Sequence, residues 1–283
     1  MQTVAIVGVG LIGGSFALAL KRAGFSGRIL GVSSHRTVES ALRLGVIDEA
    51  LPLDVAIPQA DLVYLAQPIA RILQTIGMLD PMAKPGSLVT DAGSTKAMIA
   101  DLAGRAIRHA QFLGGHPMAG KEMRGVEQAT ADLFQGRTYV LTPSSPSDLE
   151  TPAAADFVEW IRRIGAVPVV FTPAEHDRIV AHTSHLAQLS STALAATVAS
   201  RVEAAKSLDA AGPGLADTTR LALSSYDIWR DILGTNSEEI DKALAAYIAR
   251  LEALRSSLVS DRTRDEFAAA AEFAAKLRAR QGP

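Results

Sequence analysis

The chain has 283 residues, of which 48% are hydrophobic and 20% are charged, so it carries enough apolar side chain for a folded core and suits two modest domains. The formal net charge of −2 offers no basic field to nucleic acid or anionic lipid, and neither partner is expected. Cysteine is absent, which excludes disulfides and thiolate metal ligands and is compatible with the cytoplasm, where we expect the protein.

The apolar stretch near the N-terminus, VAIVGVGLIGGSFALALKRAG, has three possible interpretations: a secretory signal, a membrane span, or a strand followed by a helix. No basic residue precedes it and no small-residue cleavage pattern follows it, which argues against a signal peptide. Four glycines at its centre argue against a membrane span. We therefore predict a strand over residues 3–7, a glycine turn, and a helix over residues 11–22.

Strand-like and helical stretches then alternate along the chain. Apolar runs rich in β-branched and aromatic residues predict strands within residues 27–33, 60–68, 86–94, 111–118, 137–143 and 166–173. Helical patterns lie within residues 37–44, 69–78, 95–106 and 155–165. Such alternation is typical of parallel βαβ units, because parallel strands need a crossover helix. We predict one twisted, doubly wound α/β sheet.

After residue 173 no strand-like run appears, and Ala- and Leu-rich patterns with helical period continue to about residue 280. We predict an α/β domain over residues 1–172 and an all-α domain over residues 173–283. Several helical stretches, such as HLAQLSSTALAATVAS, are apolar on more than one side. Because such helices pack against one another or against a second copy of the chain, we expect a homodimer formed through the helical domain.

Gly8, Gly10 and Gly13 form the pattern G-x-G-x-x-G between the first strand and the first helix. In a dinucleotide site the first glycine permits a tight turn, the second lets the backbone approach a pyrophosphate, and the third lets the helix pack closely. The pyrophosphate then lies at the helix N-terminus, beside Leu11 and Ile12. A glycine turn without a ligand is the alternative, and the position between strand and helix disfavours it. We predict that the first domain is of Rossmann type.

The end of the second strand indicates which nicotinamide cofactor is preferred. NAD sites offer an acidic residue to the ribose 2′-hydroxyl at this point, and this chain has none. Ser33, Ser34 and Arg36 stand there instead, and they suit a 2′-phosphate, so NADP is favoured while NAD remains possible. The alternative is that they are ordinary loop and helix N-cap residues.

Further polar residues follow predicted strands, at the edge where ligands bind in open α/β sheets. Gln67 and Pro68 end one strand and Asp91 ends the next, and all three are assigned to the cofactor site. Ser94, in DAGSTK, either caps the following helix or faces the cofactor crevice. His116, in GGHPMAG, is either a structural histidine or the neutral base that a dehydrogenase needs.

Two patterns in the helical half have plain structural alternatives. His176, His182 and His185 suggest a metal, but no His-Glu-x-x-His pattern, cysteine or evident carboxylate ligand accompanies them, and no metal site is expected. Arg220 lies three residues after Asp217 and either pairs with it on a helix surface or serves a ligand.

Taken in order, the glycine pattern, DAGSTK, GGHPMAGKE, HTSHL and DTTRLALSSYDIW resemble the prephenate/arogenate dehydrogenase family of tyrosine biosynthesis over nearly the whole chain. The resemblance implies a Rossmann-type domain followed by a helical dimerisation domain. It also implies oxidation of the ring alcohol of prephenate or arogenate, with hydride transfer to nicotinamide and loss of the ring carboxylate as carbon dioxide. Prephenate is the first expectation and arogenate the alternative.

The resemblance also implies roles for individual residues. His116 accepts the proton of the substrate hydroxyl, Ser94 orients that hydroxyl, and Arg220 binds the ring carboxylate through both oxygens. The other expected members of the substrate site are Glu122 near the entrance, Asp217 in the ionic network around Arg220, Trp229 as a wall, His185 on the helix lining the cleft, and Lys121 and Gln188 at the substrate side chain.

Lys121 and Gln188 depart from the family's pattern, which commonly has a threonine and a second histidine at these positions. Lys121 either favours the anionic pyruvyl group of prephenate or points into solvent. Two other functions remain open: a β-hydroxyacid-type dehydrogenase, which the GHPMAG segment disfavours, and a non-catalytic NADP-sensing dimer.

Overall fold

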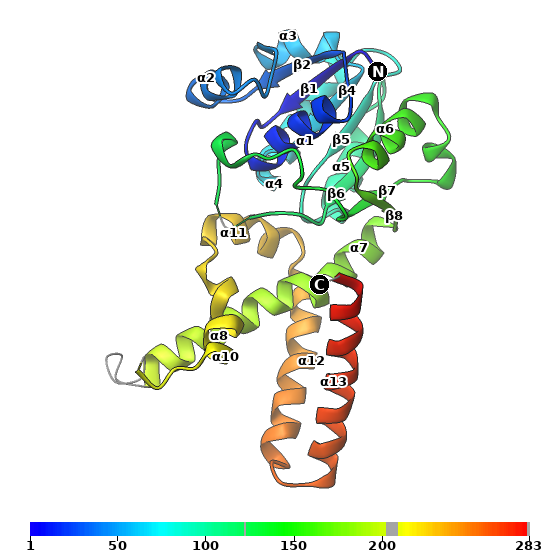
Figure 1. Cartoon of the computed structure of the whole chain (residues 1–283). Coiled ribbons are helices and arrows are strands. Elements are labelled where there is room, and N and C mark those ends of the chain that lie inside the picture. Colours follow the sequence, from blue (N-terminus) through cyan, green and yellow to red (C-terminus); the bar gives the residue numbers. More distant parts are fainter. Residues whose placement is uncertain (122, 202–208, 282–283) are drawn as a thin grey trace. The chain divides into compact units, whose positions relative to one another are not determined.

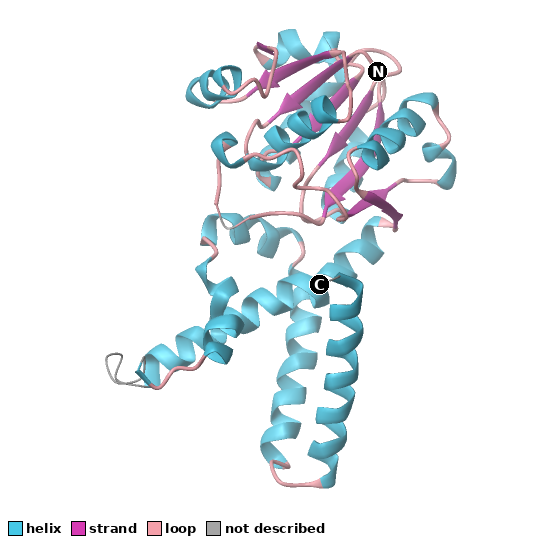
Figure 2. Ribbon diagram, in the orientation of Figure 1, coloured by secondary structure: helices cyan, strands magenta, loops and turns pink. Residues whose placement is uncertain are grey.

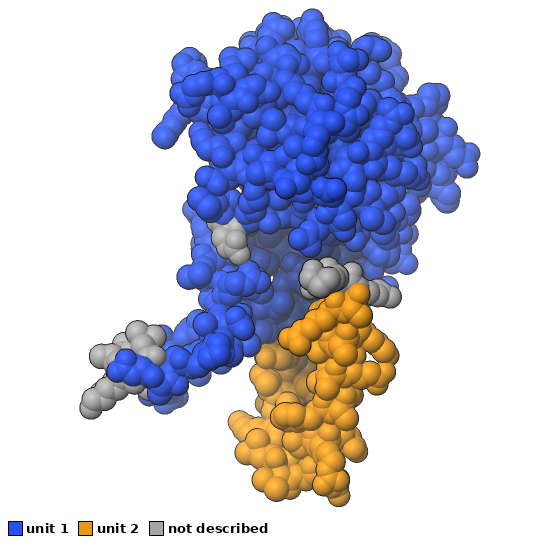
Figure 3. Space-filling view, in the orientation of Figure 1, with its two compact units in different colours: residues 1–237 blue, residues 238–283 orange. Residues whose placement is uncertain are grey.

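The computed structural model describes residues 1–121, 123–201 and 209–281. Its internal contacts divide the chain into two compact units, residues 1–237 and residues 238–283 (Figure 3). Within the described ranges, no helix combines the length and the apolar character that crossing a bilayer requires. The domain boundary at residues 172 and 173 stays a prediction.

An eight-stranded sheet in the order β3-β2-β1-β4-β5-β6-β7-β8 forms the centre of the first unit (Figures 1 and 2). Neighbouring strands from β3 to β6 are parallel, and this order is that of a doubly wound dinucleotide-binding fold. The strands are β1 (Thr3–Val7), β2 (Arg28–Val32), β3 (Glu49–Ala50), β4 (Leu62–Leu65), β5 (Leu88–Asp91), β6 (Gln111–Pro117), β7 (Thr138–Thr142) and β8 (Val167–Val170).

Two hydrophobic clusters cover the two faces of this sheet. Alternate residues of β1 reach them, with Val4 and Ile6 in one cluster and Ala5 and Val7 in the other, as the two-residue period of a strand requires. Because both faces are covered, the central strands read as continuous apolar runs. The helices that supply the clusters are α1 (Leu11–Arg22), α2 (His35–Arg43), α3 (Leu53–Ala56), α4 (Ile69–Leu79), α5 (Ala97–Ala106) and α6 (Pro152–Arg163).

The β6–β7 pair departs from the predicted parallel pattern. The two strands run antiparallel, with Gly115 opposite Leu141, whereas β8 returns parallel to β7 after α6. Among its described residues, the connection over 118–137 contains only the short 3₁₀ turn η3 (Val126–Gln128). Because it has no crossover helix, this connection reverses the chain direction instead of restoring it.

The described elements of the first unit that follow β8 are all helical. They are α7 (Pro173–Val180), the π-helical turn η5 (Ala181–His185), α8 (Leu186–Arg201), α10 (Pro213–Thr219), the 3₁₀ turn η6 (Arg220–Leu223) and α11 (Tyr226–Thr235). Trp229 and Ile232 of α11 pack against the hydrophobic cluster that α4 and α5 share. The hydroxyls of Thr95 and Thr235, 2.8 Å apart, add a polar contact between α11 and the turn before α5.

The second unit consists of α12 (Ser237–Ser256), apart from its first residue, and α13 (Asp261–Gln281). These helices lie side by side as an antiparallel hairpin (Figure 1). Arg250 on α12 donates a hydrogen bond to Glu266 on α13 at 2.7 Å. Large apolar side chains of the hairpin stay exposed in the single chain, including Ile248, Phe267 and Phe273.

Candidate functional site

The glycine turn lies between β1 and α1, at the carboxyl edge of the sheet. Gly8 has a φ of +99°, and a Cβ there would lie 2.7 Å from the carbonyl group of Ala66, just after β4. A Cβ on Gly13 would lie 2.2 Å from the Gly8 carbonyl oxygen, so only glycine lets α1 approach this closely. At Gly10, in contrast, a Cβ would meet no atom within 4 Å. The fold thus requires the first and third glycines, while the second faces open space.

The N-terminus of α1 suits an anion such as a pyrophosphate. Its N-cap is Gly10, which has no side chain to occupy the first N–H groups of the helix, and no acidic residue lies in its first turn. The positive end of the helix dipole is therefore available to a ligand. Leu11 and Ile12 form the start of this turn and are partly buried. These residues fit a dinucleotide.

Gln67 and Pro68 follow β4, directly beside the glycine turn. A Cβ on Gly8 would lie 2.9 Å from the backbone nitrogen of Gln67, which measures how close the two segments are. The side-chain oxygen of Gln67 accepts a hydrogen bond from Thr75 at 2.9 Å, and Pro68 is exposed. Both residues therefore lie at the switch point of the sheet, where doubly wound folds bind their ligands.

Ser33, Ser34 and Arg36 are exposed at the carboxyl end of β2. Ser34 is the N-cap of α2, but its hydroxyl makes no capping hydrogen bond and lies 2.8 Å from the Thr37 hydroxyl. Arg36 lies in the first turn of this helix. These three predicted cofactor residues thus follow β2, the strand that pairs with β1, and the glycine turn follows β1.

A buried ion pair holds the turn between β5 and α5. Lys96 pairs with the carboxylate of Asp91, both side chains are 0% exposed, and the Lys96 ammonium also donates to the Gly115 carbonyl oxygen at 2.8 Å. Asp91 accepts further hydrogen bonds from the backbone N–H groups of Gly93 and Gly115, at 2.8 and 3.2 Å. Burial lowers the pKa of Lys96, while Asp91 opposes that shift. Both oxygens of Asp91 are thus used inside the protein.

This network places Ser94 and His116 in one neighbourhood. Ser94 is partly buried in the turn that the ion pair holds, and His116 directly follows Gly115 on the adjacent strand β6. Ser94 is not the N-cap that its position suggested, because α5 begins at Ala97 with Lys96 as its N-cap. Its hydroxyl is therefore not needed to cap the helix.

His116 is partly exposed and contacts a second imidazole. Its Nδ1 lies 2.8 Å from Nε2 of His176, and Nδ1 of His176 lies 2.7 Å from Oδ1 of Asp177. Burial, together with His176, Lys96 and His185, holds the pKa of His116 well below its ordinary value. His116 is therefore neutral at pH 7, as a general base must be.

Asp177 caps α5 from a distant part of the chain. Its carboxylate oxygens accept hydrogen bonds from the backbone N–H groups of Lys96 and Ala97, at 2.7 and 2.9 Å, and its own carbonyl oxygen accepts one from Asn236 at 2.8 Å. The sequence pattern suggested His176 only as a possible metal ligand and did not point to Asp177. The signal available was a His-Asp pair in a helix opened by Thr172 and Glu175.

His185 is buried in the π-helical turn, a feature that often marks functional sites. Burial lowers its pKa to about 4. Its Nδ1 lies 3.3 Å from the amide nitrogen of Asn236, and its ring packs edge-on against Trp229 with centroids 5.7 Å apart. His185 and Trp229, predicted separately, therefore pack against each other. Within the described ranges, no three His, Cys, Asp or Glu side chains are grouped so that they would hold a metal ion.

Gln188 is buried and bonded to the segment that carries Arg220. Its amide nitrogen donates to the carbonyl oxygen of Leu221 at 2.8 Å, and the hydroxyl of Ser191 accepts from the backbone N–H of Ala222 at 3.1 Å. Arg220 begins η6 and is exposed, as is Asp217 on α10. In this structure Gln188 therefore holds η6 in place.

Lys121 is exposed in the β6–β7 connection, and its ammonium donates within that connection to the carbonyl oxygen of Gln128 and the hydroxyl of Thr130, both at 3.2 Å. Thr130 in turn donates its backbone N–H to the hydroxyl of Ser15 on α1, at 3.0 Å. Glu122, also assigned to the substrate site, lies outside the described residues.

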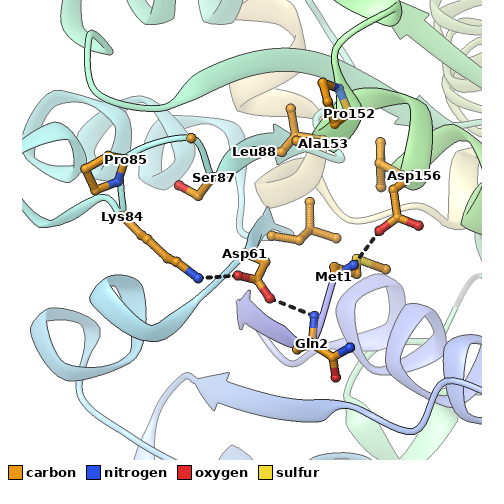
Figure 4. Close-up of a pocket in the computed structure, with 13 residues that line it drawn as sticks. Met1, Gln2, Asp61, Lys84, Pro85, Ser87, Leu88, Pro152, Ala153 and Asp156 are labelled. Carbon is orange, nitrogen blue, oxygen red and sulfur yellow. Dashed lines mark hydrogen bonds and ion pairs between the residues drawn. The ribbon is translucent and has the colours of Figure 1, made fainter.

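A cavity of about 380 Å³ lies at the opposite, amino-terminal edge of the sheet (Figure 4). Its charged groups are paired, since Lys84 binds Asp61 and the amino group of Met1 binds Asp156. None of the predicted site residues that the structure describes lines it. The carboxyl edge, with the glycine turn and His116, is the candidate site.

The protein combines a doubly wound sheet with a helix N-terminus suited to a pyrophosphate and a neutral histidine at the same edge. These are the features of a nicotinamide-dependent dehydrogenase. Residues 16–177 match the family model described as "Prephenate dehydrogenase, nucleotide-binding domain". Residues 172–273 match the model described as "Prephenate dehydrogenase, dimerization domain". The chain belongs to the prephenate dehydrogenase family.

Individual relatives agree with this assignment. The chain is 34% identical to a prephenate dehydrogenase of Bacillus subtilis over 90% of its own length and 70% of the relative's, and 27% identical to a cyclohexadienyl dehydrogenase of Zymomonas mobilis over 91% and 88%. The structure of Aquifex aeolicus prephenate dehydrogenase in complex with hydroxyphenyl propionate and NAD⁺ matches with a TM-score of 0.87 at 31% identity, over 98% of this chain and 97% of that one. Synechocystis arogenate dehydrogenase matches with a TM-score of 0.80 at 30% identity, over 99% and 100%.

Proposed function

We propose that this protein oxidises prephenate to 4-hydroxyphenylpyruvate and carbon dioxide, with arogenate as the second candidate substrate. The observation that carries the proposal is the neutral, partly exposed imidazole of His116 at the edge that holds the glycine turn. The name of the Bacillus subtilis relative supports prephenate, and the similarity to the Synechocystis enzyme keeps arogenate as the alternative.

In this mechanism His116 accepts the proton of the substrate's ring hydroxyl. The bound nicotinamide supplies an acceptor for the hydride that leaves the same ring carbon. The bond between the ring and its carboxylate then breaks, and its electron pair passes through the ring to the oxygen of the newly formed ketone. Carbon dioxide leaves as the ring becomes aromatic, and that oxygen takes back the proton held by His116. Ser94 orients the hydroxyl, and Arg220 binds the carboxylate with both of its terminal nitrogens.

The structure supports different tasks for two of the assigned residues. Asp91 acts through its buried pair with Lys96, which fixes the Ser94 turn against Gly115, and both of its oxygens are bonded within the protein. Gln188 acts through the segment that begins at Arg220. Trp229 and His185 are proposed to close one side of the substrate site. Lys121 is proposed at the substrate side chain and Asp217 in the ionic network around Arg220, while Glu122, which was predicted at the entrance, lies outside the described residues.

We also propose that NADP is preferred over NAD. The exposed hydroxyls of Ser33 and Ser34 and the guanidinium of Arg36 support this preference, because they can bind a 2′-phosphate and β2 offers no carboxylate to a 2′-hydroxyl. The rest of the proposed cofactor site consists of Gly8, Gly10, Leu11, Ile12, Gly13, Gln67 and Pro68.

The protein is further proposed to act as a homodimer in the cytoplasm. The dimerization-domain match and the exposed Phe267 and Phe273 of α13 support the dimer. Light scattering of the purified protein, and of the F267D variant, tests whether these residues form the contact between copies.

A substrate panel tests the proposed activity. Purified protein is mixed with prephenate or arogenate and with NADP or NAD, and reduced cofactor is followed by absorbance. His116→Asn is expected to lower kcat by about 10²–10⁴-fold while cofactor binding is kept, whereas an NADP sensor would be indifferent to this change. Turnover of a simple β-hydroxyacid with no turnover of either ring substrate would refute the proposal.

A further inference from the structure

The contacts of His116 determine which of its two nitrogens can act as a base. A neutral imidazole carries its proton on one nitrogen and a lone pair on the other, and only the second can accept a proton. Nδ1 of His116 is engaged with His176, so Nε2 is the nitrogen left for a substrate. A proton on Nε2 would leave the substrate hydroxyl with no acceptor on this ring.

The proton positions follow from Asp177. Its carboxylate offers only acceptors and already receives the N–H groups of Lys96 and Ala97. Nδ1 of His176, 2.7 Å from Oδ1 of Asp177, must therefore donate. With His176 neutral, its Nε2 carries a lone pair and accepts, so Nδ1 of His116 must be the donor at 2.8 Å. The lone pair of His116 then lies on Nε2.

We propose that His176 is a positioning residue that fixes His116 in the tautomer with its proton on Nδ1 and its lone pair on Nε2. Asp177 anchors this arrangement because it is held at the N-terminus of α5 by two backbone groups. The catalytic consequence rests on the proposed function, but the tautomer does not. A doubly protonated His176 is the alternative, and it would place the proton of His116 on Nε2.

The packing around His116 also determines which charged groups lie close to it when it takes up a proton. Among the residues that the structure describes, the charged and titratable groups that act on it are Lys96 from the turn before α5, His176 from α7 and His185 from η5, with Asp177 behind His176. A proton taken up at Nε2 of His116 leaves both of its nitrogens as donors, and the hydrogen bond to Nε2 of His176 is kept. The hydrogen bonds that join His116 to His176, and His176 to Asp177, therefore need no rearrangement during the proton transfer.

Nitrogen NMR of the full chain with ¹⁵N-labelled histidine tests the tautomer directly, because protonated and unprotonated imidazole nitrogens resonate far apart. The His116 signals are assigned from their loss in His116→Asn. We expect a protonated Nδ1 and a bare Nε2 at pH 7.5 in the native protein, and a shift towards the opposite tautomer in His176→Leu. A native His116 with its proton on Nε2, or an unchanged tautomer in His176→Leu, would overturn the proposal.

Kinetics of the same variants test the consequence. His176→Leu is expected to lower kcat on the order of 100-fold, with the dissociation constant of NADP unchanged. His176→Gln, whose amide oxygen can still accept from Nδ1, should retain kcat within about 10-fold of native. His182 is an exposed histidine in η5, the turn that follows α7. His182→Leu is the matched control, and its kcat should equal that of the native protein. Equal losses in the Leu and Gln variants would contradict the positioning role.

The two measurements separate this inference from the proposed function. If the native protein turns over neither prephenate nor arogenate but has the expected tautomer, the proposed function fails and the structural role of His176 stands. If turnover is present and the tautomer is reversed, the role of His176 fails and the proposed function stands.

Discussion

The carboxylate of Asp231 accepts a hydrogen bond from the backbone N–H of Ala70, 3.0 Å away and 161 positions earlier in the chain. Ala70 lies in the first turn of α4, directly after Gln67 and Pro68, so a residue of α11 caps the helix that begins at the proposed cofactor site. Asp177 does the same for α5. Two aspartates thus attach α7, which leads into the turn that carries His185, and α11, which carries Trp229, to the N-termini of two helices that cover the sheet.

We expect Asp231→Ala to lower the free energy of unfolding by about 1 kcal/mol, the usual cost of losing a helix cap. Arg230→Ala is the matched control, because it removes only the ion pair of Asp231 at 3.5 Å and should cost less than about 0.5 kcal/mol. Urea unfolding of both variants measures the difference. Similar losses would mean that the ion pair, and not the cap, stabilises α11.

The pH dependence of turnover should reflect the lowered pKa of His116. A base acts only when neutral, so kcat/KM should stay level as the pH falls from 8 through 6.5 and should decline only below that, once His116 is protonated. Initial rates with prephenate across this range measure the acid limb. A midpoint at or above 6.5 would show that His116 is not held neutral by its surroundings.

Protein stability should depend on pH through His185. Its pKa is lowered to about 4 in the folded chain, so between pH 6.5 and 4 the unfolded chain binds a proton that the folded chain does not. This contribution is fully present above pH 6.5 and is lost as the pH falls, by about 2 kcal/mol between pH 7 and 5. His185→Asn should show a loss smaller by that amount. His35→Asn, at an exposed position, should keep the native slope in urea unfolding at each pH.

Arg220 and Gln188 should act on the same step of substrate binding. Arg220→Lys is expected to lower kcat/KM by about 10–100-fold, because an ammonium cannot match two carboxylate oxygens at once. Gln188→Ala should raise KM by about 5-fold, the value of one hydrogen bond, with little change in kcat. In an Arg220→Ala background the effect of Gln188→Ala should shrink. Thr197 is exposed on the same helix as Gln188, so Thr197→Ala is the control. Full additivity of the Arg220→Ala and Gln188→Ala effects would indicate independent roles.

Cofactor choice should depend on Arg36. Arg36→Ala is expected to raise KM for NADP by about 10-fold or more and KM for NAD by less than about 2-fold, since only NADP carries the 2′-phosphate. Arg43→Ala, later on the same helix and also exposed, should change neither value. Equal effects of Arg36→Ala on both cofactors would contradict the proposed contact.

The sequence predicted the part of the fold that local patterns encode. The glycine turn, the alternation of strands and helices, and the helical second half are local features, and the structure and family matches confirm the fold class. The strand β3 and the helix α3 are too short to produce a period and were not predicted. The strand β7 was predicted, but its antiparallel direction was not, because that direction depends on a connection without a crossover helix.

The site was predicted residue by residue, but its connections were not. His116 and Ser94 were singled out from their segments, whereas the bonds from Asp177 to Lys96 and from Gln188 to Leu221 join positions 81 and 33 residues apart. No local pattern reports such pairs. For this reason Ser94 was considered as a cap that Asp177 in fact provides, and the buried pair of Asp91 with Lys96 was not predicted.

The connection over residues 118–137, which links β6 to the antiparallel strand β7, lies beside two parts of the proposed site. It leaves the strand that carries His116 and then crosses α1, where Thr130 bonds to Ser15 and Val126 lies close to Gly14. The connection that begins beside the base therefore contacts the helix whose N-terminus is assigned to the dinucleotide. By thermodynamic reciprocity, if the dinucleotide alters the affinity for the ring substrate through this segment, the ring substrate must alter the affinity for the dinucleotide by the same factor.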